Sequence, residues 1–283
     1  HTYRIGSLHQ APAGAPHHIA FYDELRLLGF VEGQNLAVDR QGYGLKVEDL
    51  AAHASVLAKS PIDVVLCGGD AAIRAAQKAT GAVPIVAVTD DRVRAGFVRS
   101  LAKPNRNVTG ISILATELDG KRQEILVEAV PGIRRVAALA DRATTSLEQA
   151  KALQKLAGAH GVELSLHWTA QADEIAGAVE AAHKAQAQAI NVLATPLLFN
   201  NRRIILERVA ALKLPAIYQW PETSEEGGFA AYGPRFTQVY RQVARLMAKV
   251  FNGAKPADIP VEQPTRFELV LNLKTATAIG REI

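Results

Sequence analysis

The sequence predicts an α/β protein with two similar Rossmann-like lobes, each built on a parallel sheet, joined by a multi-strand hinge. A chain of 283 residues is long enough for two domains of ordinary size. Strand and helix patterns alternate along it, which favours parallel strands with right-handed crossovers. One strand–helix–strand pattern occurs twice, because residues 63–90 are echoed by residues 189–220. The repeat indicates two lobes of the same kind.

The first lobe begins with a short apolar strand and a helix that Gly29 ends. Further strands and helices then alternate up to the first copy of the repeat. A strand after that copy closes the lobe. The predicted strands are 3–8, 35–40, 63–70, 83–90 and 107–113, and the predicted helices are 17–28, 47–59 and 71–79.

The second lobe follows a helix at 117–130, which Pro131-Gly132 ends. Its predicted strands are 135–141, 162–168, 189–196 and 214–220. A short strand between glycines, 227–233, is expected to return the chain to the first lobe. The helix that follows, 236–251, carries one apolar stripe that must pack on a lobe, and the tail 259–273 alternates like a strand.

These patterns give domain boundaries. We expect the first lobe to contain residues 1–114 plus about 226–256. We expect the second to contain residues 115–225 plus about 257–283. Since open parallel sheets bind ligands outside the carboxyl ends of their strands, two such lobes would line one cleft from both sides.

Composition excludes several classes of protein. The 32 basic and 28 acidic residues are scattered along the chain, without the basic stripe that a nucleic acid requires as partner. The single cysteine excludes an intrachain disulfide and a CxxC metal site. No apolar run reaches the ~18 residues of a membrane-spanning helix. The chain opens directly into a strand, so it is either cytoplasmic or lacks a leader that was removed.

Common catalytic motifs are incomplete or missing. Gly110-Ile111-Ser112-Ile113-Leu114 lacks the second glycine of a nucleophile elbow, and there is no GxxxxGK[ST], GxGxxG or HExxH. The histidines, including the pair His17-His18, lack metal-ligand spacing and are interpreted as surface or capping residues. Cys67 ends a strand but is better explained by core packing than by nucleophilic attack. We therefore expect no catalytic residue, no metal site and no cofactor.

Two turns combine small residues with carboxylates at strand ends. Gly68-Gly69-Asp70 precedes a helix, and Thr89-Asp90-Asp91 ends the next strand. The side chains of Asp70 and of Asp90 or Asp91 would cap helices. Alternatively, glycine exposes backbone N–H groups to a ligand anion while the carboxylates receive an ammonium group. The two interpretations are compatible, and the sequence leaves both open.

The second copy of the repeat ends on aromatic and polar residues, Tyr218-Gln219-Trp220-Pro221-Glu222. A buried strand seldom ends in this way. Rings around a flat ligand, with Gln219 and Glu222 fixing its orientation, would explain the pattern. Alternatively, Trp220 merely covers the hinge.

Several segments together resemble a known family, the ABC transporter substrate-binding proteins related to the tryptophan- and tyrosine-binding group. The tail is the most specific of them. The segments are Gly29–Leu36, Pro84–Val88, Asn107–Gly110, Leu214–Tyr218, Gly227–Pro234 and Ile259–Ala276. The resemblance implies a type I periplasmic-binding-protein fold, an exported periplasmic protein whose leader is absent from this chain, and a membrane permease as partner. It implies no catalysis.

The resemblance also places a ligand site in the turns after the strands. The positions carried over are Ser7, His9, Gly69, Asp70, Thr89, Asp90, Asp141, Thr195, Tyr218 and Gln219. The chain departs from the family at Leu8-His9-Gln10, where small residues are usual, and at Thr89-Asp90-Asp91, where Gly-Asp-Pro is usual.

The preferred hypothesis is a solute-binding protein that closes over an aromatic amino acid or an aromatic carboxylate and presents it to an ABC permease. Tyr218 and Trp220 would contact the ring. Backbone N–H groups near Gly69 and Thr89 would bind the carboxylate, and Asp90 or Asp141 the amine. Two alternatives stay open: the ligand-sensing core of a transcriptional regulator, and a cleft enzyme that uses Asp90, Asp141 or Cys67.

Overall fold

The computed structural model divides the chain into two compact units. Unit 1 comprises residues 1–114 and 236–265, and unit 2 comprises residues 115–235 and 266–283. The structure describes residues 1–93, 95–102, 104 and 107–281. The chain therefore crosses between the units three times, after Leu114, Arg235 and Thr265.

Unit 1 is built on a five-stranded parallel sheet in the order β2-β1-β3-β4-β5. Every strand except β2 is largely buried, as the apolar runs predict for a parallel sheet covered on both faces. The strands are β1 (Tyr3–Leu8), β2 (Leu36–Val38), β3 (Val64–Gly68), β4 (Ile85–Thr89) and β5 (Val108–Ser112).

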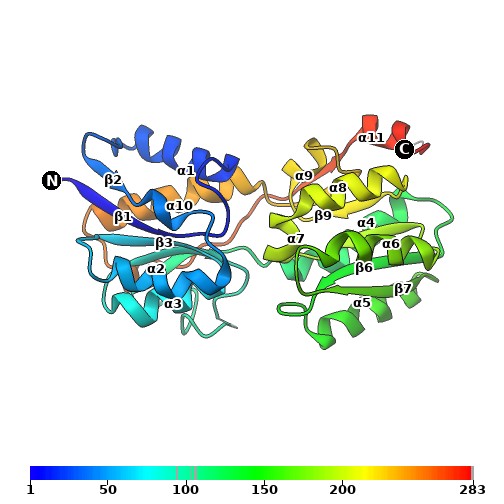
Figure 1. Ribbon diagram of the computed structural model, residues 1–283, viewed down its shortest axis with the longest axis horizontal. Coiled ribbons are helices and arrows are strands. Elements are labelled where there is room, and N and C mark those ends of the chain that lie inside the picture. The colour runs from blue at the N-terminus through cyan, green and yellow to red at the C-terminus, as the bar shows by residue number, and fades with distance from the viewer. Residues whose placement is uncertain (94, 103, 105–106, 282–283) are drawn as a thin grey trace. The chain divides into compact units, whose positions relative to one another are not determined.

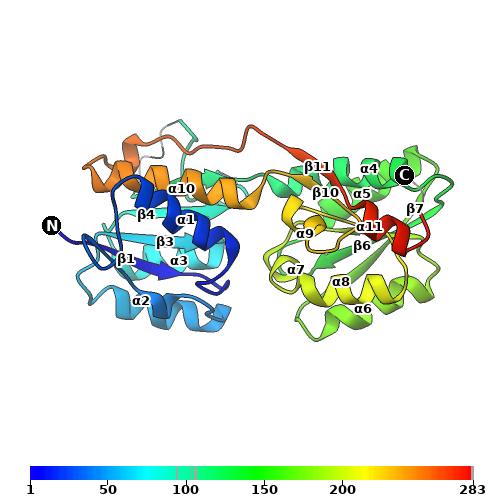
Figure 2. The same cartoon turned by 90° about the horizontal axis from the view of Figure 1, so that it is seen from above.

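Helices cover both faces of this sheet. One apolar core joins the sheet to α1 and α10, and another joins it to α2 and α3, so unit 1 has three layers (Figures 1 and 2). The predicted apolar stripe of α10 is confirmed, because Val239, Val243 and Leu246 are buried against α1 and the sheet. The helices are α1 (Pro16–Leu27), α2 (Leu50–Leu57), α3 (Asp70–Thr80) and α10 (Phe236–Phe251).

Unit 2 is built on a six-stranded sheet in the order β11-β10-β9-β8-β6-β7, in which only β11 is antiparallel. Helices α4 and α5 pack on one face, and α6 and α8 on the other (Figure 2). The strands are β6 (Arg135–Asp141), β7 (Glu163–Thr169), β8 (Ala189–Val192), β9 (Ala216–Tyr218), β10 (Ala230–Gly233) and β11 (Glu268–Leu271). The helices are α4 (Asp119–Ala129), α5 (Leu147–Ala159), α6 (Glu174–Lys184), α7 (Pro196–Asn200), α8 (Arg202–Ala211), α9 (Pro221–Glu225) and α11 (Leu273–Ala278).

Two segments belong to units other than those expected from the sequence. Residues 226–235 lie in unit 2, because β10 pairs with β9 before the chain returns to unit 1. Residues 257–265 lie in unit 1, where the backbone of Val261 and Glu262 bonds to Leu101, Gly110 and Ser112. The tail enters unit 2 only afterwards, and only Glu268–Leu271 of the predicted 259–273 strand is a strand.

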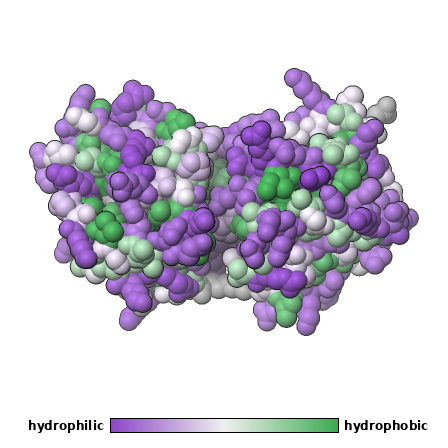
Figure 3. All heavy atoms as spheres, in the orientation of Figure 1, coloured by the Kyte–Doolittle hydropathy of each residue, from purple (hydrophilic) through white to green (hydrophobic). Residues whose placement is uncertain are grey.

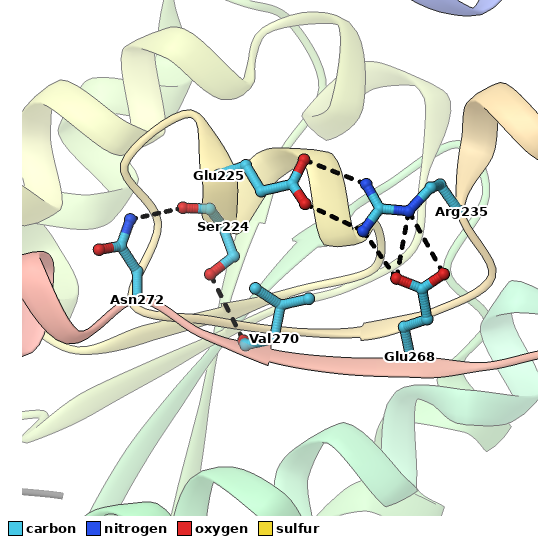
Figure 4. Close-up of polar contacts among 6 residues, drawn as sticks. All are labelled: Ser224, Glu225, Arg235, Glu268, Val270 and Asn272. Atoms are coloured by element: carbon cyan, nitrogen blue, oxygen red, sulfur yellow. Dashed lines mark hydrogen bonds and ion pairs between the residues drawn. The ribbon is translucent and has the colours of Figure 1, made fainter.

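Arg235 ties two of the crossing segments together inside unit 2 (Figure 4). Its guanidinium forms ion pairs with Glu225, at 2.9 Å, and with Glu268, at 2.6 Å. The bonds from the two carboxylates raise the pKa of Arg235, and Arg235 lowers the pKa of Glu268. Arg235 is the last residue before the chain leaves unit 2, and Glu268 starts β11 soon after the chain returns to unit 2. The Arg235 side chain therefore links the outgoing and the returning segments.

The face of the molecule that Figure 3 draws is mainly polar. On the face in Figure 3, hydrophilic residues cover most of both units and hydrophobic residues appear in small, separate groups. Among the described residues, none of the helices combines the length and the apolar character needed to cross a membrane.

Candidate ligand-binding site

The candidate residues of unit 1 lie at the carboxyl ends of three neighbouring strands. Ser7 and His9 end β1, Gly69 and Asp70 follow β3, and Thr89 and Asp90 end β4. The register pairs Leu8 with Cys67 and Gly68 with Val88, which brings these ends together. The Thr89 hydroxyl donates a hydrogen bond to the Asp70 carboxylate. Two residues 19 positions apart thus meet at one edge of the sheet.

The structure changes the interpretation of the Gly-Gly-Asp turn. Asp70 is the first residue of α3 rather than its cap, and its carboxylate accepts from Thr89 instead of from the helix backbone. The N-cap is Gly69, whose φ of 87° suits glycine. The Gly69 N–H donates to the Val88 carbonyl at 2.8 Å, so it is not available to a ligand anion. Asp91 accepts from the Val93 N–H at 3.0 Å, in a turn.

A buried cluster of histidines and tyrosines surrounds the end of β1. His9, His17 and His18 are at most 6% exposed, so the expectation of a surface or capping role is wrong for the His17-His18 pair, whereas His160 and His183 are exposed. The N-cap of α1 is Ala15, without a side-chain cap. The His9 ring stacks on Tyr43 at 5.3 Å and meets His18 edge-on at 4.6 Å. Gly68 makes room for it, since a Cβ there would lie 2.5 Å from His9 Nδ1.

Burial keeps His9 and His18 neutral. It lowers the pKa of His18 to about 4, assisted by Arg40, although the hydrogen bond to the Pro12 carbonyl opposes the shift. Burial also lowers the pKa of His9 well below its ordinary value, with His18 and His17 adding to the effect. Near neutral pH, both rings therefore carry one proton each.

Acidification is expected to destabilise unit 1 before the carboxylates titrate. An unfolded histidine has a pKa near 6.5, so below that pH the unfolded state binds more protons than the folded state. The contribution of neutral His18 to the free energy of unfolding is fully present above pH 6.5. It is lost as the pH falls toward the folded-state pKa of His18, about 4. His18 alone should remove roughly 2 kcal/mol between pH 7 and pH 5. Hydrogen exchange of β1 and β3 amides, corrected for intrinsic rates, measures the loss.

A His18→Gln variant supplies the control for this pH dependence. It lacks the titrating ring, so the part of the loss that His18 causes should disappear, whatever the variant's stability at pH 7. An unchanged pH slope in this variant would contradict the assignment to His18.

In unit 2, two candidates bind their own turns. The Asp141 carboxylate, at the end of β6, accepts the Ala143 N–H at 2.9 Å and the Thr144 hydroxyl at 2.8 Å. The Thr195 hydroxyl, after β8, accepts the Leu198 N–H at 3.2 Å and caps α7. Both residues lie at carboxyl ends of strands, and both carry a structural role there.

The aromatic segment at the end of β9, Tyr218 to Trp220, is buried. The Tyr218 ring packs in the core between the sheet, α6 and α8, and its hydroxyl is buried without a partner among the described residues. Gln219 and Trp220 are at most 5% exposed, and Trp220 meets Phe199 edge-on at 5.9 Å. Glu222 is half-buried in α9. The ring of Tyr218 is therefore part of the core. Of the two rings predicted to contact a ligand, only that of Trp220 remains at the strand end.

Among the described residues, the side chains that could bind a metal or act as nucleophiles do not come together in a metal or thiol centre. In the part of the chain that the structure describes, no group of three or more His, Cys, Asp or Glu residues is placed to bind a metal ion. Cys67 is fully buried in the core beside α3, which confirms the packing interpretation. Burial raises the pKa of its thiol, so the thiol stays protonated.

Sequence reasoning missed a buried ion pair beside the end of β8. Asp119 and Arg122, on the first turn of α4, pair with side chains at most 1% exposed. Asp119 also accepts from the Ala194 N–H and from Gln149, while Arg122 donates to the carbonyls of Ala115 and Tyr232. The only local indication of this ion pair was the spacing of three residues between Asp119 and Arg122 on a helix. Pairs with that spacing usually lie on the exposed face of a helix, so the spacing did not indicate burial.

The chain has two α/β units, each with a mostly parallel sheet and polar residues at the strand ends. These features define the class of two-lobed binding proteins with the type I periplasmic-binding-protein fold. The model of the family described as ABC transporter substrate binding protein matches residues 13–282. The chain belongs to this family of substrate-binding proteins, which confirms the resemblance seen in the sequence.

Individual relatives agree with this assignment. The tyrosine-binding protein of Clostridioides difficile is 24% identical over 268 residues, which cover 93% of this chain and 76% of the relative. An ABC domain in complex with L-Trp from Streptococcus pneumonia has a TM-score of 0.85 and 22% identity, covering 99% of this chain and 95% of its own. A conserved domain protein from Vibrio cholerae has a TM-score of 0.88 and 22% identity, covering 100% and 96%. The structural likenesses show the shared fold.

Proposed function

We propose that the chain binds an aromatic amino acid or a related aromatic carboxylate and delivers it to an ABC importer permease in the membrane. The observation that carries this proposal is the family match over residues 13–282. The tyrosine-binding relative and the L-Trp complex support the class of ligand. We place the protein in the periplasm, where such a carrier meets the permease.

The residues proposed to bind the ligand lie at strand ends in each unit. Trp220 supplies a ring, while Gln219 and Glu222 orient the ligand from the same segment. Because the Gly69 N–H and the Thr89 hydroxyl are already bonded, the ligand carboxylate is assigned to backbone N–H groups near Thr89 and to the first-turn N–H groups of α3. Ser7, His9, Asp70, Asp90, Asp141, Thr195 and Tyr218 complete the proposed site.

The proposal includes no chemical conversion of the ligand. The enzyme alternative needs a nucleophile or an acid–base pair. Burial keeps the Cys67 thiol protonated, and the Asp141 carboxylate is engaged by its own turn. A ligand incubated with the protein should be recovered unchanged by mass spectrometry.

L-Tryptophan, L-tyrosine and L-phenylalanine are expected to raise the unfolding temperature more than sugars or aliphatic amino acids do. A ligand at a hundred times its Kd adds about 2.7 kcal/mol to the stability of the folded state. Differential scanning fluorimetry measures the shift. L-Leucine and L-isoleucine are the matched controls, since they share the backbone groups but have no ring. Larger shifts with sugars or with these aliphatic amino acids would refute the aromatic assignment.

A further inference from the structure

A pair of hydrogen-bonded histidines lies at the end of β1. His18 Nδ1 is 2.8 Å from the Pro12 carbonyl oxygen, and His18 Nε2 is 3.3 Å from His9 Nδ1. The two side chains are at most 2% exposed. Their geometry fixes which nitrogen carries each proton.

The direction of the hydrogen bonds follows from the carbonyl. A carbonyl oxygen only accepts, so His18 Nδ1 carries the proton and donates to Pro12. The neutral His18 ring then has a lone pair at Nε2, and His9 Nδ1 must donate to it. Because His9 is also neutral, its single proton is used, and His9 Nε2 presents a lone pair.

That lone pair has no partner. His9 Nε2 is buried and lacks a hydrogen bond to any part of the chain that the structure describes. Buried polar atoms are nearly always satisfied, since an unpaired acceptor lowers stability. An exception at a strand end of a binding protein indicates a donor that arrives with the ligand.

The surroundings fix the ring and favour a positively charged donor. Tyr43 stacks on the His9 ring at an angle of 8°, and Gly68 leaves space for the ring beside β3. The Asp70 carboxylate begins α3 two residues after Gly68, at the same edge of the sheet. A rigid, neutral acceptor suits an ammonium group better than an anionic group, because a carboxylate has no proton to donate and a charged donor forms the stronger hydrogen bond.

We propose that His9 Nε2 accepts a hydrogen bond from the protonated amine of the ligand, so that the site selects α-amino acids over carboxylates without an amine. This inference rests on the proposed function and narrows its ligand class. The His18–His9 chain positions the lone pair by holding His9 in the tautomer protonated at Nδ1.

Two His9 variants separate the two ring nitrogens. His9→Asn retains an amide nitrogen near the place of Nδ1 but has no acceptor near the place of Nε2. His9→Gln retains an amide oxygen near the place of Nε2. Both lose the stacking on Tyr43, so each controls for the packing loss of the other. Calorimetric titration with L-tryptophan and with 3-(indol-3-yl)propionate gives the amine preference of each protein.

We expect wild type to bind L-tryptophan about tenfold or more tighter than indolylpropionate. His9→Asn should lose most of this preference and His9→Gln should retain most of it. An equal preference in wild type and His9→Asn overturns the inference, as does equal affinity of wild type for both compounds, while the proposed function stands. If wild type binds neither compound, the proposed function itself fails, and the inference with it.

Long-range ¹H–¹⁵N correlation spectra of wild type give a readout that needs no variant. The ligand-free protein should show His9 protonated at Nδ1. The Nε2 resonance should move on addition of L-tryptophan and not on addition of indolylpropionate. A ligand-free His9 protonated at Nε2, or an Nε2 resonance that ignores L-tryptophan, overturns the inference.

Discussion

Replacing Asp119 with asparagine is expected to lower the free energy of unfolding of unit 2 by about 3–5 kcal/mol, because Arg122 then stays buried without its counterion. Arg122 is 0% exposed and Asp119 1% exposed, so water cannot solvate the remaining charge. Burial raises the pKa of Asp119, and Arg122 opposes this shift most strongly. The substitution also places an amide nitrogen where Asp119 now accepts from Gln149.

Tryptophan fluorescence measures this loss selectively. Trp168 and Trp220 are the two tryptophans of the chain, and both lie in unit 2. Urea unfolding followed by tryptophan emission therefore reports on the unit that contains the ion pair. The double variant Asp119→Leu/Arg122→Met should recover much of the loss, since it removes both charges. Glu207→Gln is the control, because its pair with Arg203 is exposed and is worth well below 1 kcal/mol. A change for Asp119→Asn as small as that of this control would contradict the expectation.

Gly110→Ala in β5 is expected to destabilise unit 1 by about 4 kcal/mol or more. Gly110 has a φ of 132°, which L residues with a side chain rarely adopt. A Cβ there would lie 2.1 Å from the Ala87 carbonyl oxygen and 2.7 Å from Arg92 Nη2. Neither can move freely, because the Arg92 guanidinium is fully buried and donates to the carbonyls of Ala87, Thr109 and Ile111.

The readout for this variant is hydrogen exchange in β4 and β5. Protection of these strands should be lost in Gly110→Ala. In Gly14→Ala it should persist, because a Cβ at Gly14 meets nothing within 4 Å. Wild-type protection in Gly110→Ala would show that the sheet tolerates the added methyl group, contrary to the expectation.

Much of the fold follows from local sequence patterns. The strand predicted at 135–141 is β6 with the same bounds, and the stripe of α10 at 236–251 was visible in its three-and-four spacing. Prolines explain the main failure, since Pro260 and Pro264 interrupt the predicted 259–273 strand and confine β11 to Glu268–Leu271. The unit to which β10 belongs depends on its pairing with β9, and a short apolar strand does not specify its partner.

The site was less predictable, because its contacts join residues that are distant in the sequence. The predicted strand ends identified Asp70 and Thr89 as separate candidates. The hydrogen bond between their side chains depends on the register of β3 and β4, which the sequence does not show. The His17-His18 pair seemed polar and exposed, yet the loop after β1 brings His18 against His9 and Tyr43. Spacing rules detect partners three or four positions apart, whereas these partners lie 9 and 25 positions away.

The late position of α10 in the chain has a consequence for synthesis. This helix covers one face of the first sheet, through Tyr240, Val243 and Met247 among others. During translation, β1 to β5 emerge with α1 but without α10 on that face, and residues 115–235 of unit 2 must be made before α10 arrives. At about 10 residues per second the delay is on the order of ten seconds. Until α10 is made, unit 1 therefore exposes apolar surface to which chaperones can bind. At that stage nearly all residues of unit 2 have already been synthesised.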